Sequence, residues 1–301
     1  MPELSLLIPS RNEDYLQNTI DDIFKHSEAD IEVIVGLDGL DKSIFTINKH
    51  PERFKRLFVW DLDNPIGQRA MTNLLANHAR GKYIAKIDSH CSFAQGFDRI
   101  LLESMEEDMI VTPILARLHA FDWVCSCGKR ENQDTPFKCH DVKKETVWEI
   151  LSKPFTNRYG FDSNFIFQYL PNEEGKLVET MALQGSFFMI LKDKYFELNI
   201  CDEAMGSWGF QGIETACKGW FNNMRVVTNK DTYYAHYFKE KIIDGKVVVD
   251  ISYNRPQKEI DFAHKKIKEM FDSKDIAWLV KKFDYPCDWD KKKVRELLTK
   301  Q

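Results

Sequence analysis

Short apolar runs alternate with segments of helical periodicity in the first third of the chain. Apolar runs of strand length occupy residues 4–8, 31–35, 57–60 and 83–87. Between them, apolar side chains recur at helical spacing. Strands separated by helices predict an α/β fold, with a mostly parallel sheet covered by helices on both faces. The helical positions are Leu16, Ile20, Ile23 and Phe24, followed by Met71, Leu74, Leu75 and His78.

Polar residues stand where three of the predicted strands end. Asn12 comes after the first strand and is also expected to cap the following helix. Asp38 ends the second strand, and Asp88 directly follows the fourth. Ligands of parallel sheets bind beyond the carboxyl ends of the strands. We therefore expect these three segments to converge on one crevice.

The later part of the chain is organised differently. Residues 113–180 lack a regular pattern and are interpreted as an insert. After His236 the chain becomes charged and amphipathic, and we expect two helices, one marked by Ile260, Ala263 and Ile267 and the other over residues 291–298. The predicted organisation is a main domain over residues 1–240 and a C-terminal helical extension over residues 241–301.

Composition and charge exclude some classes of protein. A net charge of −5 over 301 residues argues against a general affinity for nucleic acid. The N-terminus has no signal-peptide pattern, and no apolar run reaches the length of a membrane span. Seven cysteines form no regular framework, which is typical of reduced thiols in a cytosol. These features predict a cytoplasmic protein without an integral membrane segment.

One group of cysteines stands out inside the insert. Cys125 and Cys127 are followed by the adjacent pair Cys139 and His140. Three thiols and an imidazole form a suitable ligand set for a structural zinc ion with tetrahedral geometry. The alternative is that these are ordinary cysteines of an insert, and the sequence leaves both interpretations open.

A carboxylate and an imidazole lie two residues apart at the end of the fourth predicted strand. Side chains alternate along extended backbone, so Asp88 and His90 point to the same side. Mg²⁺ and Mn²⁺ prefer carboxylate oxygens, and Mn²⁺ also accepts imidazole. The alternative is a loop aspartate beside a surface histidine. The strand-end position, together with His236 as a third ligand, favours a site for Mn²⁺ or Mg²⁺.

These motifs carry a resemblance to a known family. Residues 4–238 resemble family-two-like glycosyltransferases of the GT-A fold, in which a mostly parallel sheet binds a nucleotide sugar. Within that group the chain is most similar to polypeptide N-acetylgalactosaminyltransferases, which implies a UDP-sugar donor. The matching segments are Asp88-Ser89-His90-Cys91, Gly185-Ser186-Phe187, Trp208-Gly209, Trp220 and His236.

The resemblance also implies roles for individual residues. Asp88, His90 and His236 would bind the metal, and Asp38 would lie near the uridine. Arg69 would lie near the base or the diphosphate. The alternatives are a turn-forming Asp38, a surface Arg69 and a core His236. The nucleotide contacts implied in addition are Pro9, Ser10, Arg11, Asn12, Glu13, Ser89 and Trp208.

The chain departs from the family at one catalytic position. Gln211 stands where the family has a glutamate that faces the sugar, and an amide cannot take up a proton. We expect Gln211 to orient a sugar hydroxyl, which favours retention of anomeric configuration. Glu214 is the carboxylate left as a base for inversion, and its alternative role is structural, tying down its own helix.

The expected function is metal-dependent transfer of a sugar from a UDP-sugar. The acceptor would be a glycan, a protein or a modified DNA base, with the insert on the acceptor side, and the source would be bacterial or viral. One alternative is a catalytically silent GT-A scaffold that binds glycan or nucleic acid, and the full metal set argues against it. The other is a nucleotidyltransferase, whose glycine-rich first loop is not present at residues 9–13.

Overall fold

The N-terminal strands and helices form as the hydrophobic pattern predicts. The computed structural model describes residues 1–39, 57–135, 137–152, 156–243, 246–249 and 257–299. Its first four strands pair in parallel, with the fourth beside the first, the first beside the second and the second beside the third. These pairings confirm the α/β architecture. The strands are β1 (Leu4–Ser10), β2 (Ile31–Asp38), β3 (Leu57–Leu62) and β4 (Tyr83–Ile87).

Helices cover this half of the sheet. Every residue of β1 and β2 is buried, so both of their faces are covered. Gly36 lets the second helix approach β2 closely, because a Cβ atom there would lie 2.2 Å from Met71 Sδ. The helices that follow β1, β3 and β4 in the chain are α1 (Leu16–His26), α2 (Gln68–His78) and α3 (Phe97–Ser104).

The prediction that Asn12 caps α1 is wrong. The helix begins at Leu16, Tyr15 occupies the cap position, and no side chain caps it. Asn12 lies earlier, with a left-handed backbone (φ of 51°). Asparagine tolerates this conformation better than most residues. The loop after β1 is therefore longer than the local sequence suggested.

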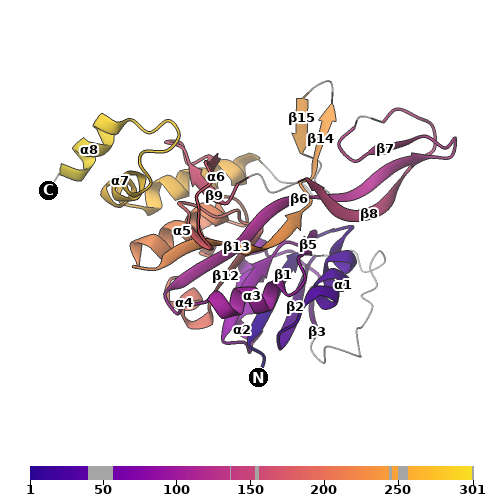
Figure 1. Cartoon of the computed structure of the whole chain (residues 1–301), viewed down its shortest axis with the longest axis horizontal. Helices are drawn as coiled ribbons and strands as arrows, with labels where there is room; N and C mark the ends of the chain where they lie inside the picture. The colour runs from indigo at the N-terminus through magenta and orange to yellow at the C-terminus, as the bar shows by residue number, and fades with distance from the viewer. Residues whose placement is uncertain (40–56, 136, 153–155, 244–245, 250–256, 300–301) are drawn as a thin grey trace.

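The second half of the sheet brings a distant strand to the end of β4. The strands are β5 (Cys91–Phe93), β6 (Met109–Cys125), β11 (Leu177–Glu179), β12 (Phe187–Leu191) and β13 (Arg225–His236). The strand order is β11–β13–β6–β12–β4–β1–β2–β3 (Figure 1). β13 also pairs with β5, with His236 opposite Cys91. This register places His236 next to His90.

The predicted insert begins inside a long strand. β6 continues past the sheet and pairs with β7 (Arg130–Asn132) and β8 (Val142–Ser152). We call residues 117–152 the arm, which projects from the body of the molecule (Figure 1). The root of the arm packs against the loop after β1, where Tyr15 stacks on Phe121. The rest of the insert includes the hairpin of β9 (Arg158–Phe161) and β10 (Phe167–Leu170).

The C-terminal part contains the two predicted helices and one more. They are α6 (Gln257–Met270), α7 (Ser273–Lys282), which the sequence analysis missed, and α8 (Lys291–Thr299). A hairpin of β14 (Glu240–Ile243) and β15 (Lys246–Val249) precedes them. Within the described part of the chain, none of the helices combines the length and apolar character needed to span a bilayer.

Helix α6 packs on the loop that precedes α5 (Gln211–Phe221). Phe210 stacks on His264, with 5.1 Å between the ring centroids. Ser207 donates a hydrogen bond to Glu259. The C-terminal helices therefore contact a loop that forms part of the cavity described next.

Candidate active site

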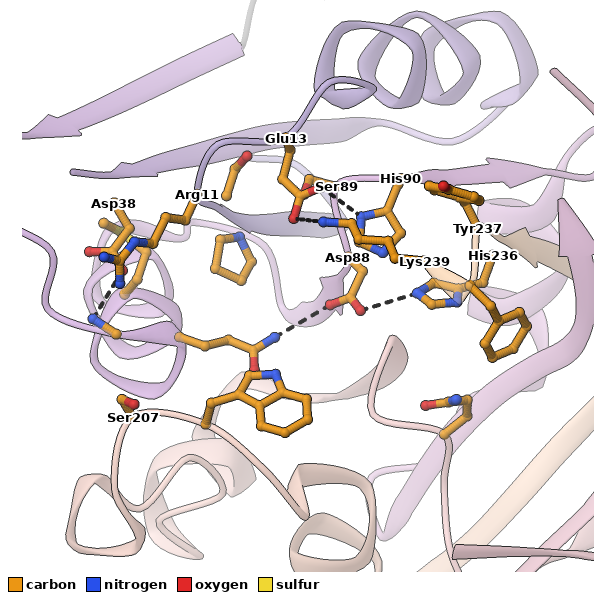
Figure 2. A pocket seen from close by; sticks show the side chains of 18 residues that line it. Arg11, Glu13, Asp38, Asp88, Ser89, His90, Ser207, His236, Tyr237 and Lys239 are labelled. Atoms are coloured by element: carbon orange, nitrogen blue, oxygen red, sulfur yellow. Dashed lines mark hydrogen bonds and ion pairs between the residues drawn. The ribbon is translucent and has the colours of Figure 1, made fainter. Parts of the chain in front are cut away.

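A cavity of about 380 Å³ opens beyond the carboxyl ends of β1, β2 and β4. Figure 2 shows it as an elongated site, with Arg11 and Asp38 at one end, Asp88 in the middle and His236 and Tyr237 at the other end. This is the edge of the sheet at which the sequence predicted a crevice. The lining residues are Pro9, Ser10, Arg11, Glu13, Asp38, Gly67, Gln68, Met71, Asp88, Ser89, His90, Gln184, Ser207, Trp208, His236, Tyr237, Phe238 and Lys239.

Three side chains from two parts of the chain meet in this cavity. Asp88 and His90 lie in the short connection between β4 and β5, and His236 ends β13. The ligand atoms of all three lie within 4.8 Å of one another, and the two imidazole rings are 4.7 Å apart. One carboxylate and two imidazoles form a ligand set that suits Mn²⁺ better than Mg²⁺.

The two oxygens of Asp88 have different partners. Oδ1 accepts hydrogen bonds from Lys86, which lies two residues earlier on β4, and from Gln68 at 3.4 Å. Oδ2 lies 3.3 Å from His236 Nε2. Burial alone would raise the pKa of Asp88, but the Lys86 ammonium and the His236 ring hold it well below its usual value. Asp88 is therefore ionised, with Oδ2 turned toward the two histidines.

His90 is oriented by a carboxylate. Its Nδ1 lies 3.1 Å from Glu13 Oε2, and the other oxygen of Glu13 accepts a hydrogen bond from Lys239. Burial would raise the pKa of Glu13, but His90 and Lys239 lower it overall. A proton on Nδ1 leaves the Nε2 lone pair of His90 for a metal ion, the arrangement common in carboxylate–histidine–metal sites.

The surroundings of His236 also fit a metal ligand. The side chain is buried, its Nε2 lies 3.3 Å from Asp88 Oδ2, and its Nδ1 has no hydrogen-bond partner among the described residues. Burial lowers the pKa of His236 to about 4. The ring is thus neutral near pH 7, and a buried neutral imidazole beside a carboxylate can donate a lone pair to a cation that both side chains share.

Not all of the residues predicted to contact the nucleotide line the first cavity. Most of them line the cavity, but Asn12 faces a smaller neighbouring cavity of about 160 Å³. Asp38 is buried and accepts hydrogen bonds from the backbone N–H groups of Ile66 and Gly67, at 2.6 and 3.0 Å. It therefore holds the start of α2 in place at the edge of the cavity.

The structure does not bring Arg69 or Glu214 to the lining of this cavity. Both are fully buried, and they form an ion pair of 2.9 Å between α2 and α5. Arg69 also donates hydrogen bonds to the carbonyl groups of Gly206 and Gly209. Lys218, one turn along α5, donates to Glu214 as well. This arrangement matches the structural alternative for Glu214 and ties α2 to α5 and to the loop between Gly206 and Gly209.

A second cavity of about 420 Å³ adjoins the first. It shares Gln68, Asp88, Gln184 and Trp208 with the first cavity and is otherwise largely apolar. Gln211 lines it, and the amide nitrogen of Gln211 contacts the buried Cys201 Sγ at 2.9 Å. Its further lining residues are Ile166, Phe167, Leu183, Gly185, Ser186, Gly209, Phe210, Gly212, Ile213 and Ile260.

Two cations close to Asp88 and His90 were not singled out from the sequence: Lys86, which bonds Asp88 but does not line the first cavity, and Lys239, which does. Lys86 is buried on β4, where it bonds Asp88 and, at 2.7 Å, the carbonyl oxygen of Gly185. A charged residue two positions before Asp88 in a buried strand is the signal that could have revealed it. Lys239 lies three residues after His236, and no pattern in the neighbouring sequence indicates that it lines the cavity.

Comparison with known proteins identifies the family. The model of glycosyl transferase family 2 matches residues 5–161, slightly more than half of the chain. The chain therefore belongs to glycosyl transferase family 2, and it has the GT-A fold of a glycosyltransferase.

Two relatives among curated proteins come from animals. "Probable N-acetylgalactosaminyltransferase 8" of Caenorhabditis elegans is 27% identical over 165 residues, covering 54% of this chain and 35% of that protein. "Polypeptide N-acetylgalactosaminyltransferase 3" of Drosophila melanogaster is 19% identical over 263 residues, covering 79% of this chain and 35% of that protein. The chain thus spans about a third of the length of these relatives.

Solved structures show the same fold. GalNAc-T7 with UDP, GalNAc and Mn²⁺ superposes with a TM-score of 0.68 at 15% identity, covering 98% of this chain and 54% of that one. Residues 1–349 of Staphylococcus aureus TarS with UDP-GlcNAc give 0.51 at 13% identity, covering 98% and 70%. The family assignment and the fold expected from the motifs are thereby confirmed.

Lys86 provides a test of how Asp88 is oriented. Replacing Lys86 with methionine removes the partner of Oδ1 and lets the carboxylate rotate, so we expect sugar transfer to fall about ten- to a hundredfold, the scale found for residues that orient metal ligands. Lys82→Met is the matched control, because Lys82 is exposed just before the same strand. Steady-state kinetics checks this, and full activity of Lys86→Met would show that Asp88 needs no such support.

Proposed function

We propose that the protein transfers a sugar from a UDP-sugar to an acceptor and requires a divalent metal ion for this reaction. The observation that carries the proposal is the meeting of Asp88, His90 and His236 in the middle and at one end of the first cavity. A bound Mn²⁺ or Mg²⁺ would act there as a Lewis acid that stabilises the departing diphosphate.

The shape of the cavity supports one orientation of the donor. The base and ribose would lie at the end formed by Arg11 and Asp38, and the diphosphate would lie beside Asp88 (Figure 2). The ammonium group of Lys239, which is paired with Glu13, lines the same cavity and would add a positive charge near the diphosphate. The further proposed contacts are Pro9, Ser10, Glu13, Ser89 and Trp208.

The second cavity is the proposed entrance for the acceptor. Gln68, Asp88 and Trp208 belong to the walls of both cavities, so a donor sugar beside Asp88 would also face the second one. An apolar wall with Phe167 and Ile260 suits an acceptor with an apolar portion, carried by a glycan, a protein or a modified DNA base. Gln211, in the same wall, remains the proposed partner of a sugar hydroxyl, with retention of configuration.

A screen for UDP release tests the proposed function. Several UDP-sugars are incubated with the protein, with Mn²⁺ and with excess EDTA, each with and without candidate acceptors. We expect UDP release only with the metal. Binding of nucleotide without turnover of any donor would favour a silent scaffold, and formation of pyrophosphate from UTP and a sugar phosphate would favour a nucleotidyltransferase.

The choice of nucleotide gives a separate prediction. We expect UDP to bind more tightly than GDP or ADP when Mn²⁺ is present, because the chain is related to transferases that use UDP-sugars. Isothermal titration calorimetry with the three diphosphates checks this prediction. Equal or tighter binding of GDP would assign the protein to a different donor class.

A further inference from the structure

A second group of metal-binding side chains lies in the arm, separate in sequence from Asp88, His90 and His236. The ligand atoms of Cys125, Cys139 and His140 lie within 4.8 Å of one another. Cys127 Sγ is 3.5 Å from Cys139 Sγ, and Cys139 Sγ is 3.6 Å from His140 Nδ1. The fold thus gathers all four residues that the sequence singled out.

The distances from Cys139 Sγ to Cys127 Sγ and to His140 Nδ1 fit neighbouring ligands around a common ion, while Cys127 lies outside the set of three residues whose ligand atoms are all within 4.8 Å of one another. In a tetrahedral zinc site, Zn–S bonds of about 2.3 Å and Zn–N bonds of about 2.0 Å separate neighbouring ligand atoms by roughly 3.5–3.8 Å. A disulfide would bring the two sulfurs to about 2.05 Å, whereas the sulfurs of Cys127 and Cys139 are 3.5 Å apart and both cysteines are free.

The backbone around Cys125 prepares it as a ligand. Residues 125–128 form a tight turn, in which the N–H of Gly128 donates to the Cys125 carbonyl oxygen at 2.9 Å. The N–H of Cys127 points at Cys125 Sγ, 3.5 Å away. An N–H group that donates to a sulfur stabilises negative charge on it, because a hydrogen bond to a charged group favours the charged form.

The end of the arm is held by strand pairing and partly exposed ion pairs but has almost no buried side chains. Among the described residues between 126 and 141, only Gln133 is buried, and it bonds the backbone of Leu118 and Ala120 on β6. Segments that cannot build an apolar core commonly depend on a metal or on disulfides. A link between Cys125–Cys127 and Cys139–His140 would close the loop between β7 and β8.

We propose that Cys125, Cys127, Cys139 and His140 bind one structural zinc ion that holds the end of the arm together. The site is independent of the proposed transfer reaction, because none of the four residues lines either of the two large cavities. Its test therefore does not depend on finding the sugar or the acceptor.

Elemental analysis of the full-length protein tests the proposal. We expect one equivalent of zinc per chain after purification without chelators, and loss of most of it in Cys127→Ser and in Cys139→Ser. Cys287→Ser is the matched control, because Cys287 is an exposed free cysteine outside the cluster, and it should keep its zinc. His90→Ala should keep it as well, whereas loss of zinc in that variant would place the ion at the first cavity and overturn the proposal.

Cobalt substitution tests the proposal on the wild-type protein and therefore does not depend on whether the cysteine variants fold. Exchange of zinc for Co²⁺ in the wild-type protein should produce the thiolate-to-cobalt charge-transfer absorption of a tetrahedral sulfur site. After the metal has been removed with a chelator, trypsin should cleave the protein after Lys129 and Arg130 faster than it cleaves the metal-bound protein, because both residues are exposed in the arm. No retained metal together with a Cys127–Cys139 disulfide in the intact mass would overturn the proposal.

Discussion

Asp88→Ala is expected to lower sugar transfer about a thousandfold. In the proposed reaction, loss of a carboxylate that would help to hold the metal removes Lewis-acid stabilisation of the leaving diphosphate, an effect of several kcal/mol, and ~4 kcal/mol corresponds to about three decades in rate. UDP release in the presence of saturating Mn²⁺ measures the effect. The variant should also bind Mn²⁺ more weakly, which electron paramagnetic resonance of the free ion detects.

Asp193→Ala is the matched control for Asp88→Ala. Asp193 is exposed in α4 (Lys192–Glu197), which begins where β12 ends, at the edge of the sheet opposite the cavity. Its replacement should leave transfer unchanged. An Asp88→Ala variant that turns over like this control would remove Asp88 from the catalytic machinery and with it the proposed metal site.

Arg69→Met is expected to lower the free energy of unfolding by about 3 kcal/mol, the lower end of the cost of breaking a buried ion pair, because Lys218 still pairs with Glu214. Glu214 is completely buried, and the carbonyl groups of Gly206 and Gly209 would lose their donor as well. Equilibrium unfolding in urea measures the change as a lower midpoint at similar slope.

Two further variants separate the ion pair from simple packing. Arg225→Met removes a partly exposed pair with Glu106 and should cost no more than about 1 kcal/mol. The double variant Arg69→Met with Glu214→Met should regain part of the loss, because it removes the buried carboxylate together with the guanidinium, while Lys218 keeps the Asn199 carbonyl oxygen as an acceptor. A single Arg69→Met variant as stable as Arg225→Met would contradict the structural role.

Features set by residues that are close together in the sequence were easier to predict than features set by contacts between distant segments. β1, β2 and β4 were predictable because their apolar runs are local signals. Asp88 and His90 were found for the same reason, since two residues on one extended segment share a side. His236 was named as a third ligand without a local signal that joins it to His90, because the β13–β5 register that brings the two together is set by pairing between distant segments.

The residues whose partners lie far away in the chain were harder to interpret. The resemblance implied that Arg69 contacts the nucleotide, whereas its ion-pair partner Glu214 is 145 positions away in the chain. Lys86 was not considered separately, because it lies inside the apolar run of residues 83–87, which was interpreted only as a strand. Helix α7 carried a usable local signal that was overlooked, with Asp272 as its N-cap and Ile276, Leu279 and Val280 on its buried side.

The packing of α6 on the loop before α5 affects how this protein could be shortened or combined with segments of its relatives. Ala263 lies against Gly209, and His264 against Phe210, so the helix supports the segment that carries Trp208. A chain shortened before α6 would leave this wall of both cavities without its backing. The boundary near residue 240 therefore separates two stretches of sequence but not two exchangeable modules, and a swap of C-terminal segments between relatives would carry the shape of the substrate site with it.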